Sequence, residues 1–508
     1  MSDLLQGFAM ILQPEYLLLA LLGTILGTAV GVLPGLGPAV TISLLLPVTF
    51  ALGNPVGAFI LFGGIFYGGM YGGSTTSILL NVPGETASVV TTIDGHQMAL
   101  RGRGGAALMT AAIGSFIAGA VATLALALVA RPLVDVAIKF GPVDYLALMV
   151  LALALVSTLG GHPLKSAAMV IFGLMLSTVG IDFQTGQERF TFGSLRLGDG
   201  IDFVIAAIGL FAISEVLLSM ARKKEDTTHL IAAGKIRMTS KEWRRSAAPW
   251  ARGSIIGFIV GVLPGAGASV ASFISYGIEK TVSPFRHEMG KGAIEGVAGP
   301  EAANNASAGG SMLPLLVLGI PGSATTAVML AAFQGYGIST GPLLFEENGP
   351  LVWAIIASLF LGNAMLLVLN LPLISVWVKL LKVPPGILNP VIVVISGVGV
   401  YSLNRSSWDL LLLAILGILG LVLRWNGFPM APLILGLILG TGIETQLRRA
   451  LIGSDGDWGV LLSSPMATTL MVLAVILLFA PLLLQNRFGR RLSLARDVHA
   501  AEDTKENS

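Results

Sequence analysis

The chain has 508 residues, of which 54% are hydrophobic and only 11% are charged, and its formal net charge is +2. Soluble globular domains carry about a quarter charged residues, so this composition indicates a polytopic helical membrane protein and argues against a nucleic-acid partner. The sequence has no Cys, which excludes disulfides and thiolate metal sites, and it has no P-loop motif for binding ATP.

The first half of the chain, residues 1–221, is predicted to be one membrane repeat. Residues 16–52 form two apolar arms of about 15 residues on either side of VLPGLGP. An arm of that length rises about 22 Å as a helix, which is less than the hydrocarbon core of about 30 Å. We therefore expect a re-entrant hairpin with its turn near mid-membrane. The motif GGSTTSILLNVPGETAS (72–88) follows, and then apolar spans at 104–130, 143–160, 164–181 and 203–221.

Residues 222–248 are rich in Lys and Arg, which predicts a cytoplasmic linker. The second membrane repeat, 249–486, begins with a similar predicted hairpin at 249–279 and continues with GGSMLPLLVLGIPGSATT (309–326). Further spans are expected at 350–371, 385–400, 408–424, 427–443 and 460–485, followed by a polar cytoplasmic tail at 487–508.

The two halves repeat each other. GVLPG occurs at 31–35 and again at 261–265, an offset of 230, and the second motif recurs in the same order if one residue is inserted. In repeat 1 the first charged loop after the second motif carries Arg101 and Arg103, whereas in repeat 2 the corresponding loop carries Glu346 and Glu347. Opposite charge at matching points predicts inverted topology. The fold class is therefore predicted as all-α, with two inverted repeats, re-entrant or discontinuous helices and about 11–12 spans. The alternative counts every hairpin arm as a full span and gives parallel repeats.

The Pro-Gly breaks suggest binding chemistry. Irregular backbone survives at membrane depth only where it is buried in protein or lines a wet cavity. The hydroxyls of PGETAS and PGSATT follow each turn where a helix would begin, and a helix N-terminus favours an anion such as a carboxylate. Carbonyls at the ends of broken helices suit Na⁺. Alternatively, each hydroxyl bonds only to its own helix.

A third stretch, GPEAANNASAGG (299–310), carries Glu301, Asn304 and Asn305. These side chains are costly in an apolar setting, and they are read either as ligands of a coupling cation or substrate anion, or as helix-capping groups. The candidate substrate- and ion-binding residues are Pro34, Gly35, Gly37, Ser74, Thr75, Thr76, Asn81, Gly84, Pro264, Gly265, Gly267, Ser269, Glu301, Asn304, Asn305, Ser311, Gly322, Ser323, Thr325 and Thr326.

These motifs, together with FGPVDY, TVGIDFQTGQERFTFG and FQGYGISTGP, resemble the TctA family of tripartite tricarboxylate transporters over nearly the whole chain. The resemblance implies a permease of the bacterial inner membrane that imports citrate or another carboxylate with Na⁺ or H⁺. It also implies two partners, a small four-helix membrane subunit and a periplasmic solute-binding protein. No other cofactor and no enzymatic activity are expected. The alternatives are an anion channel and a transporter that works without a binding protein.

Overall fold

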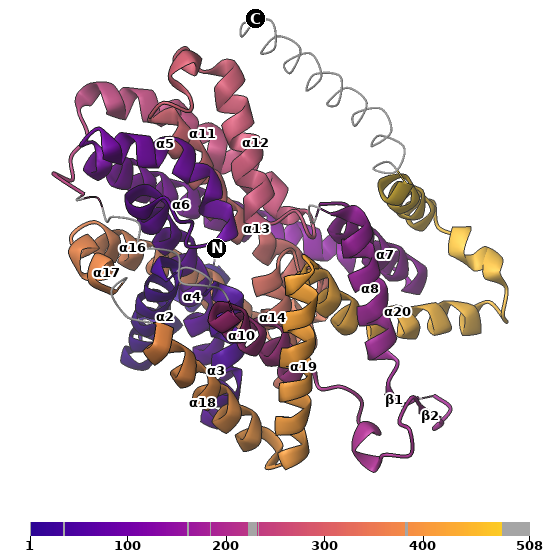
Figure 1. Cartoon of the computed structure of the whole chain (residues 1–508). Helices are drawn as coiled ribbons and strands as arrows, with labels where there is room; N and C mark the ends of the chain where they lie inside the picture. Colours follow the sequence, from indigo (N-terminus) through magenta and orange to yellow (C-terminus); the bar gives the residue numbers. More distant parts are fainter. Residues whose placement is uncertain are drawn as a thin grey trace, which may run out of the picture.

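In a computed structural model, which describes residues 2–33, 36–159, 162–182, 184–221, 231, 233–380 and 385–479, the chain folds almost entirely into helices (Figure 1). The predicted all-α class is confirmed. Within these ranges the strands are limited to a two-stranded antiparallel hairpin of β1 (Gly180–Ile181) and β2 (Glu188–Arg189).

In the first half most helices follow one another closely, but a longer segment that contains the β hairpin separates Ser177 from Phe203. The helices are α1 (Ser2–Ile11), α2 (Pro14–Val32), α3 (Pro38–Leu52), α4 (Pro55–Leu80), η1 (Thr86–Ser88), α5 (Val89–Leu100), α6 (Gly104–Ala137), α7 (Pro142–Leu159), α8 (Pro163–Ser177), η2 (Leu195–Leu197), α9 (Phe203–Ala207), η3 (Ile208–Ile213) and α10 (Ser214–Ala221).

The second half repeats this pattern with different lengths. Its helices are α11 (Ser240–Val262), α12 (Gly267–Val282), η4 (Arg286–Glu288), α13 (Glu295–Leu318), α14 (Ala324–Gly335), α15 (Pro342–Glu347), α16 (Gly349–Asn370), α17 (Ile374–Leu380), α18 (Pro385–Asn404), α19 (Ser407–Trp425), α20 (Met430–Gly453), η5 (Trp458–Leu462) and a helix over Pro465–Phe479.

Eight helices in the described part of the chain are long and apolar enough to cross a membrane, and five more apolar helices have 10–17 residues. The outer helices expose apolar side chains at helical spacing. On α18 these include Ile387, Val391, Val394 and Val398, each between 48% and 63% exposed. A helix that turns such a stripe outward has lipid or protein as its neighbour, not water. The chain is therefore a multi-pass membrane protein, and the predicted total of 11–12 spans stays a prediction.

Glycines determine which helices pack together in each repeat. A Cβ on Gly23, Gly27 or Gly31 of α2 would lie within 2.5 Å of the carbonyl oxygens of Leu61, Ile65 and Gly69 on α4. In the second half, Gly253, Gly257 and Gly261 of α11 approach the carbonyl oxygens of Gly299, Ala303 and Ser307 on α13 just as closely. The residue numbers increase in the same direction along both helices of each pair, so the two helices are parallel. Small residues allow their backbones to approach closely.

This packing corrects the alignment of the second motif. Each contact on α13 lies 238 positions after its counterpart on α4, as the pairs Leu61 and Gly299, and Ile65 and Ala303, show. Gly73 therefore corresponds to Ser311, and no inserted residue is needed within the helix. Sequence similarity instead aligns Gly72 and Gly73 with Gly309 and Gly310. That alignment shifts α13 by one residue relative to α4.

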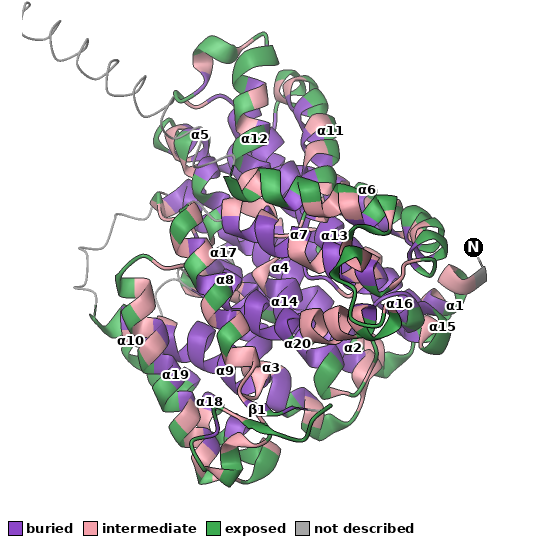
Figure 2. Ribbon diagram, turned by 90° about the vertical axis from the view of Figure 1, so that its right-hand side faces the viewer, coloured by how far each residue is buried: buried purple, intermediate pink, exposed green. Residues whose placement is uncertain are grey.

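The two repeats run in opposite directions. α4 and α13 cross antiparallel: Ser74, near the end of α4, donates to Glu301, near the start of α13, whereas Tyr67, earlier on α4, reaches Gly309 later on α13. Matched helices with opposite directions are what inverted repeats require. Figure 2 shows α4, α13 and α14 as the buried centre of the molecule.

The hairpin arms differ from prediction. α2 has 19 residues and packs along α4, so it is longer than the expected arm, while α3 has 15. The turn at Pro34 and Gly35 lies outside the described residues, so its predicted position near mid-membrane stays a prediction.

Charged loops gather at the two ends of α13. At its start, Asp94 of α5 accepts hydrogen bonds from the backbone N–H groups of Gly292 and Ala293. The adjoining Arg103 forms an ion pair with Glu242 after the central linker. At its other end, Gly319 packs against Thr340, next to the 341–349 loop. The basic and acidic loops therefore lie at opposite ends of α13, in the arrangement expected for opposite membrane faces.

Candidate functional site

The crossing of α4 and α13 contains a buried carboxylate, Glu301. Its two oxygens accept hydrogen bonds from Ser74 Oγ at 2.5 Å and from Thr91 Oγ1 of α5. All three side chains are at most 4% exposed. Glu301 thus joins the two inverted repeats through hydroxyl groups.

A second carboxylate, Glu85, lies beside the first. It is the half-buried N-cap residue of η1, just after the Pro-Gly break of repeat 1. Asn304, one turn after Glu301 on α13, donates from Nδ2 to Glu85 Oε1 at 3.1 Å. Residues three apart on a helix share a face, so both carboxylates lie on the same side of α13. We call Ser74, Glu85, Thr91, Glu301 and Asn304 the polar centre.

The polar centre contains no basic side chain. Among the described residues, no nitrogen of Lys, Arg or His lies within 4.0 Å of Glu85 or Glu301, whereas the carboxylates of Glu215, Glu279 and Glu295 each have an Arg partner. Burying an ionised carboxylate without a counter-charge is unfavourable by several kcal/mol. The arrangement can therefore take up a proton or a metal cation.

The neighbouring Asn305 makes different contacts. Its Nδ2 donates to Ser115 Oγ of α6 at 2.6 Å and to the carbonyl oxygen of Glu301. A small cavity of about 10 Å³ lies between Ser74, Thr75 and Ser115, which is close to the smallest space that holds one water.

The remaining predicted residues of repeat 1 surround the break after α4. Asn81 is the exposed C-cap of α4 in the left-handed region, with φ 57°. Thr76 donates to its own helix at the carbonyl of Gly73, and Gly84 packs against Gly31 and Gly73. Gly37 is the N-cap of α3, with nothing within 4 Å of a Cβ placed there.

The predicted residues of repeat 2 form the symmetric counterpart. Ser311 donates to the carbonyl of Ala308, and Gly322 packs against Ser311 and Gly261 as Gly84 does in repeat 1. Ser323 and Thr326 cap α14 through reciprocal hydrogen bonds, and Thr325 is buried on the same turn. Of the predicted residues, the structure therefore brings Ser74, Glu301 and Asn304 into the polar centre, but the hydrogen bonds of the α14 cap stay local.

Around the first break of repeat 2, one residue reaches the other repeat. Ser269 Oγ of α12 donates to Thr86 Oγ1 of η1 at 2.9 Å, next to Glu85. Gly265, with φ 79°, donates its N–H to the carbonyl of Gly322. Pro264 and Gly267 complete this turn, and Gly267 has open space beside it.

The sequence interpretation missed Glu85, Thr91 and Ser115. Glu85 stands inside the quoted PGETAS motif, so the acidic residue at the end of an otherwise uncharged stretch was a usable signal. Thr91 and Ser115 enter the site only through tertiary contacts with α13.

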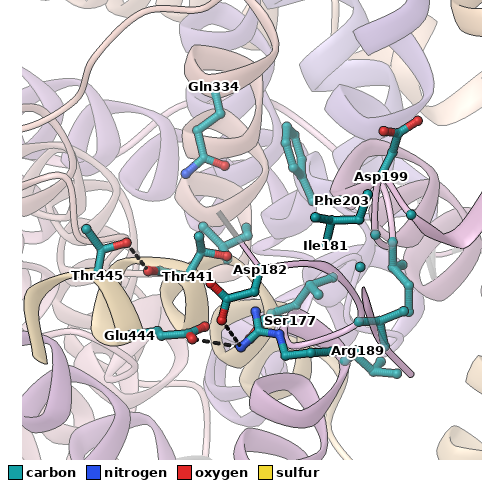
Figure 3. Close-up of a pocket in the computed structure, with 18 of the residues that line it drawn as sticks. Ser177, Ile181, Asp182, Arg189, Asp199, Phe203, Gln334, Thr441, Glu444 and Thr445 are labelled. Atoms are coloured by element: carbon teal, nitrogen blue, oxygen red, sulfur yellow. Dashed lines mark hydrogen bonds and ion pairs between the residues drawn. The ribbon is translucent and has the colours of Figure 1, made fainter. Parts of the chain in front are cut away.

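A larger cavity of about 600 Å³ lies elsewhere, between α8, the β hairpin and α20 (Figure 3). Its wall includes Gln334, which is near the C-terminal end of α14, whereas Ser323 is at the N-terminal end of that helix. None of the predicted site residues lines the cavity. Arg189 bonds Glu444 at 2.7 Å on one side of the cavity.

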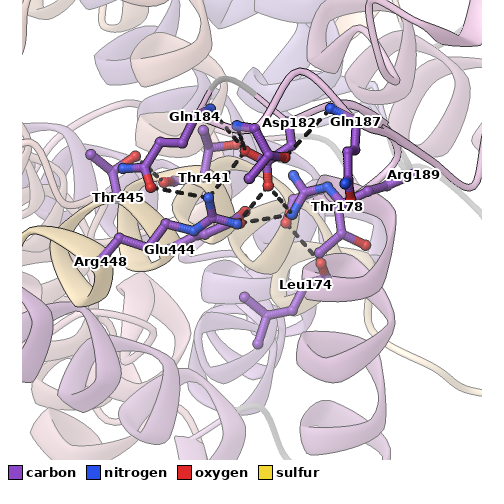
Figure 4. A network of polar contacts seen from close by, with 12 residues as sticks. Leu174, Thr178, Asp182, Gln184, Gln187, Arg189, Thr441, Glu444, Thr445 and Arg448 are labelled. Atoms are coloured by element: carbon purple, nitrogen blue, oxygen red, sulfur yellow. Dashed lines mark hydrogen bonds and ion pairs between the residues drawn. The ribbon is translucent and has the colours of Figure 1, made fainter. Parts of the chain in front are cut away.

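An ion-pair network closes this region. Arg448 on α20 forms two hydrogen bonds with Asp182, at 3.0 and 2.6 Å, and a third with Glu444 (Figure 4). The bond from Arg448, supported by backbone N–H donors, holds the pKa of Asp182 well below its usual range. The carboxylates of this network already have basic partners, so the polar centre is the stronger candidate for ion binding.

Comparison with known proteins identifies the family of the chain. The family model of the tripartite tricarboxylate transporter TctA family matches residues 17–435. A relative in Agrobacterium vitis, named as an uncharacterized 52.8 kDa protein in the TAR-I ttuC′ 3′ region, is 47% identical over 490 residues, covering 96% of this chain and 97% of the relative. A second, in the TAR-II ttuC′ 3′ region, is 47% identical over 234 residues, covering 46% of this chain and 97% of the relative. No solved structure matches the chain. With its inverted helical repeats and a family match over most of its length, the chain belongs to the tripartite tricarboxylate transporter TctA family.

Proposed function

We propose that the chain is the large permease subunit of a bacterial inner-membrane system that imports a small carboxylate, such as citrate or another di- or tricarboxylate, together with Na⁺ or H⁺. The proposal rests on membership of a transporter family and on the polar centre between the inverted repeats. The family is tripartite, and we assign the other two roles to a small four-helix membrane subunit and a periplasmic solute-binding protein.

The observation that carries cation coupling is the pair of carboxylates without basic partners. Glu85 and Glu301 lie where two discontinuous helices of opposite direction meet. Transporters with inverted repeats place coupling-ion sites at such junctions. A cation that binds there offsets the buried negative charge, so binding and the conformational change of the carrier become linked.

The symmetric position in repeat 2 is suited to the anion. Ser323 takes the place of Glu85 and caps α14 with a neutral hydroxyl, and this helix has 12 residues. The N-terminus of a helix of that length carries a partial positive charge that favours a carboxylate. One repeat thus provides an acidic junction for the cation and the other a neutral junction for the anion.

Reconstitution tests the proposal. The chain and both partner subunits are placed in proteoliposomes, and accumulation of radiolabelled citrate, succinate and other carboxylates is followed under an imposed Na⁺ or H⁺ gradient. We expect accumulation against a concentration gradient for at least one carboxylate. Equilibration without accumulation would support the channel alternative, and undiminished accumulation without the binding protein would support a self-sufficient transporter.

A further inference from the structure

Only one of the two polar atoms in the side-chain amide of Asn304 has a hydrogen-bond partner among the described residues. Its nitrogen donates to Glu85 Oε1 at 3.1 Å, but its oxygen, Oδ1, is buried and has no hydrogen-bond partner among the described residues. The side chain is fully buried. Buried polar atoms nearly always have partners, so an orphan acceptor beside a carboxylate points to a missing positive ligand.

Another buried asparagine has hydrogen-bond partners at both ends of its side-chain amide. Asn363 of α16 accepts at Oδ1 from the Tyr71 hydroxyl at 2.8 Å and donates from Nδ2 to the carbonyl of Phe116 at 2.8 Å. Both ends of that amide are satisfied within the protein. Asn304 therefore departs from a pattern that the same fold achieves elsewhere.

A proton on Glu85 does not complete the Asn304 amide. In the observed arrangement the amide nitrogen already faces Glu85, so a protonated carboxyl leaves Oδ1 unpaired. If the amide turned round, its oxygen would accept from the carboxyl and its nitrogen would lose its acceptor. A metal cation can bind both groups, because hard cations take carboxylate and amide oxygens as ligands.

The small number of available carboxylate ligands favours a monovalent ion. In the described ranges, no group of three or more His, Cys, Asp or Glu side chains could hold a metal ion, whereas divalent cations usually need several carboxylates or retained waters. Both oxygens of Glu301 already accept from hydroxyl donors, Ser74 and Thr91. Glu85 is therefore the carboxylate available to one added positive charge.

We propose that Glu85 and the side-chain oxygen of Asn304 bind one Na⁺ ion at the junction of the two repeats, with Glu301 contributing negative charge from the next turn of α13. This inference rests on the proposed function, because it assigns the coupling ion of that transport to named ligands. The site takes Na⁺ in preference to H⁺.

Na⁺-dependent thermal unfolding of the purified full-length chain tests the site without transport. NaCl is exchanged for choline chloride at constant ionic strength. A ligand that binds only the folded state raises the unfolding temperature, so we expect a saturable Na⁺-dependent rise in the wild type. Glu85→Gln, which keeps the size of the side chain, and Asn304→Ala should shift half-saturation about tenfold or more to higher Na⁺.

Asn363→Ala is the matched control. It removes a buried amide in contact with α4 and α6, so it should lower the unfolding temperature but leave the Na⁺ half-saturation unchanged. Wild-type Na⁺ dependence in both Glu85→Gln and Asn304→Ala would overturn the site. So would a wild type that transports carboxylate but gains no stability from Na⁺, and that result would leave the proposed function standing. Na⁺ stabilisation without carboxylate transport would contradict the proposed function and support the site.

Discussion

Glu85 and Glu301 are the residues on which this account depends. Ionisable side chains inside a membrane bundle are rare, and those present usually mark ion or substrate pathways. Hydroxyl and amide donors stabilise both carboxylates, yet none of these donors carries charge. A lysine or arginine in the same place would neutralise the site permanently. Neutral donors instead leave the charge available for a mobile cation.

The two neighbouring asparagines should respond differently to truncation. Asn304→Ala removes a group that contacts Glu85, so it should reduce uptake about tenfold or more and shift its cation dependence. Asn305→Ala removes the hydrogen bond to Ser115 and should mainly lower stability, by about 1–3 kcal/mol. Uptake measured against Na⁺ concentration, with membrane abundance checked by immunoblot, separates the two effects. If both variants transport at the wild-type rate with wild-type cation dependence, the asparagine pair only contributes to packing.

Within each repeat, two helices pack so closely that their backbones are in contact. α2 lies against α4 and α11 against α13 through glycines at every fourth position. Each pair is parallel. The helix that lies between the two in the sequence, α3 or α12, leads the chain back to the end of the bundle where the pair begins. This packing keeps the broken ends of both repeats next to α4 and α13, where the polar centre lies.

Gly257→Ala should destabilise the protein. The added Cβ would lie 2.3 Å from the carbonyl oxygen of Ala303, and a helix backbone cannot move away locally. Overpacking of this kind costs about 1–3 kcal/mol or more, so the unfolding temperature and the folded yield should fall. Gly277→Ala on α12 is the control, because no atom lies within 4 Å of its added Cβ. Equal stability of the two variants would show that α11 and α13 do not pack as described.

The β hairpin beside α20 should be held by Asp182 over the physiological pH range. Because its pKa is depressed, the carboxylate stays ionised above the ordinary carboxyl pKa of about 4, and its stabilising effect is lost only as the pH falls through the lowered value. Hydrogen exchange of residues 180–189 should therefore show the same protection at pH 6 and pH 8 after correction for the intrinsic rate. Asp182→Asn should reduce that protection, and Asp199→Asn, outside the ion-pair network, should not. Unchanged protection in Asp182→Asn would mean that the network does not hold the hairpin.

Much of the whole molecule follows from the sequence. The span predicted at 408–424 is α19 (Ser407–Trp425), and that at 350–371 is α16 (Gly349–Asn370), because uninterrupted apolar runs have clear ends. The inverted direction of the repeats also followed from charge. The pairing of α2 with α4 did not, because it depends on matching glycine faces, which are distant in sequence. Nor did the contact between Glu85 and Asn304, which lie 219 positions apart.

Cysteine labelling tests the inverted topology in the cell. The chain has no native Cys, so a single introduced thiol gives an unambiguous signal. Gly102 has a φ of 71°, which strains any other residue. The exposed Leu100, the last residue of α5 before this loop, is a better position. An impermeant reagent added from outside should label Asn348→Cys but not Leu100→Cys. Labelling of both would favour parallel repeats.

Gradient-driven carboxylate accumulation in proteoliposomes that contain all three subunits tests whether Glu85 and Glu301 couple transport to a cation, with Glu85→Gln and Glu301→Gln compared with the wild type. Both substitutions keep the size of the side chain and remove its negative charge. We predict that the wild type accumulates substrate under an inward cation gradient and that both variants lose accumulation while their folded yield is retained. Accumulation at the wild-type level in both variants would show that coupling does not depend on these two carboxylates.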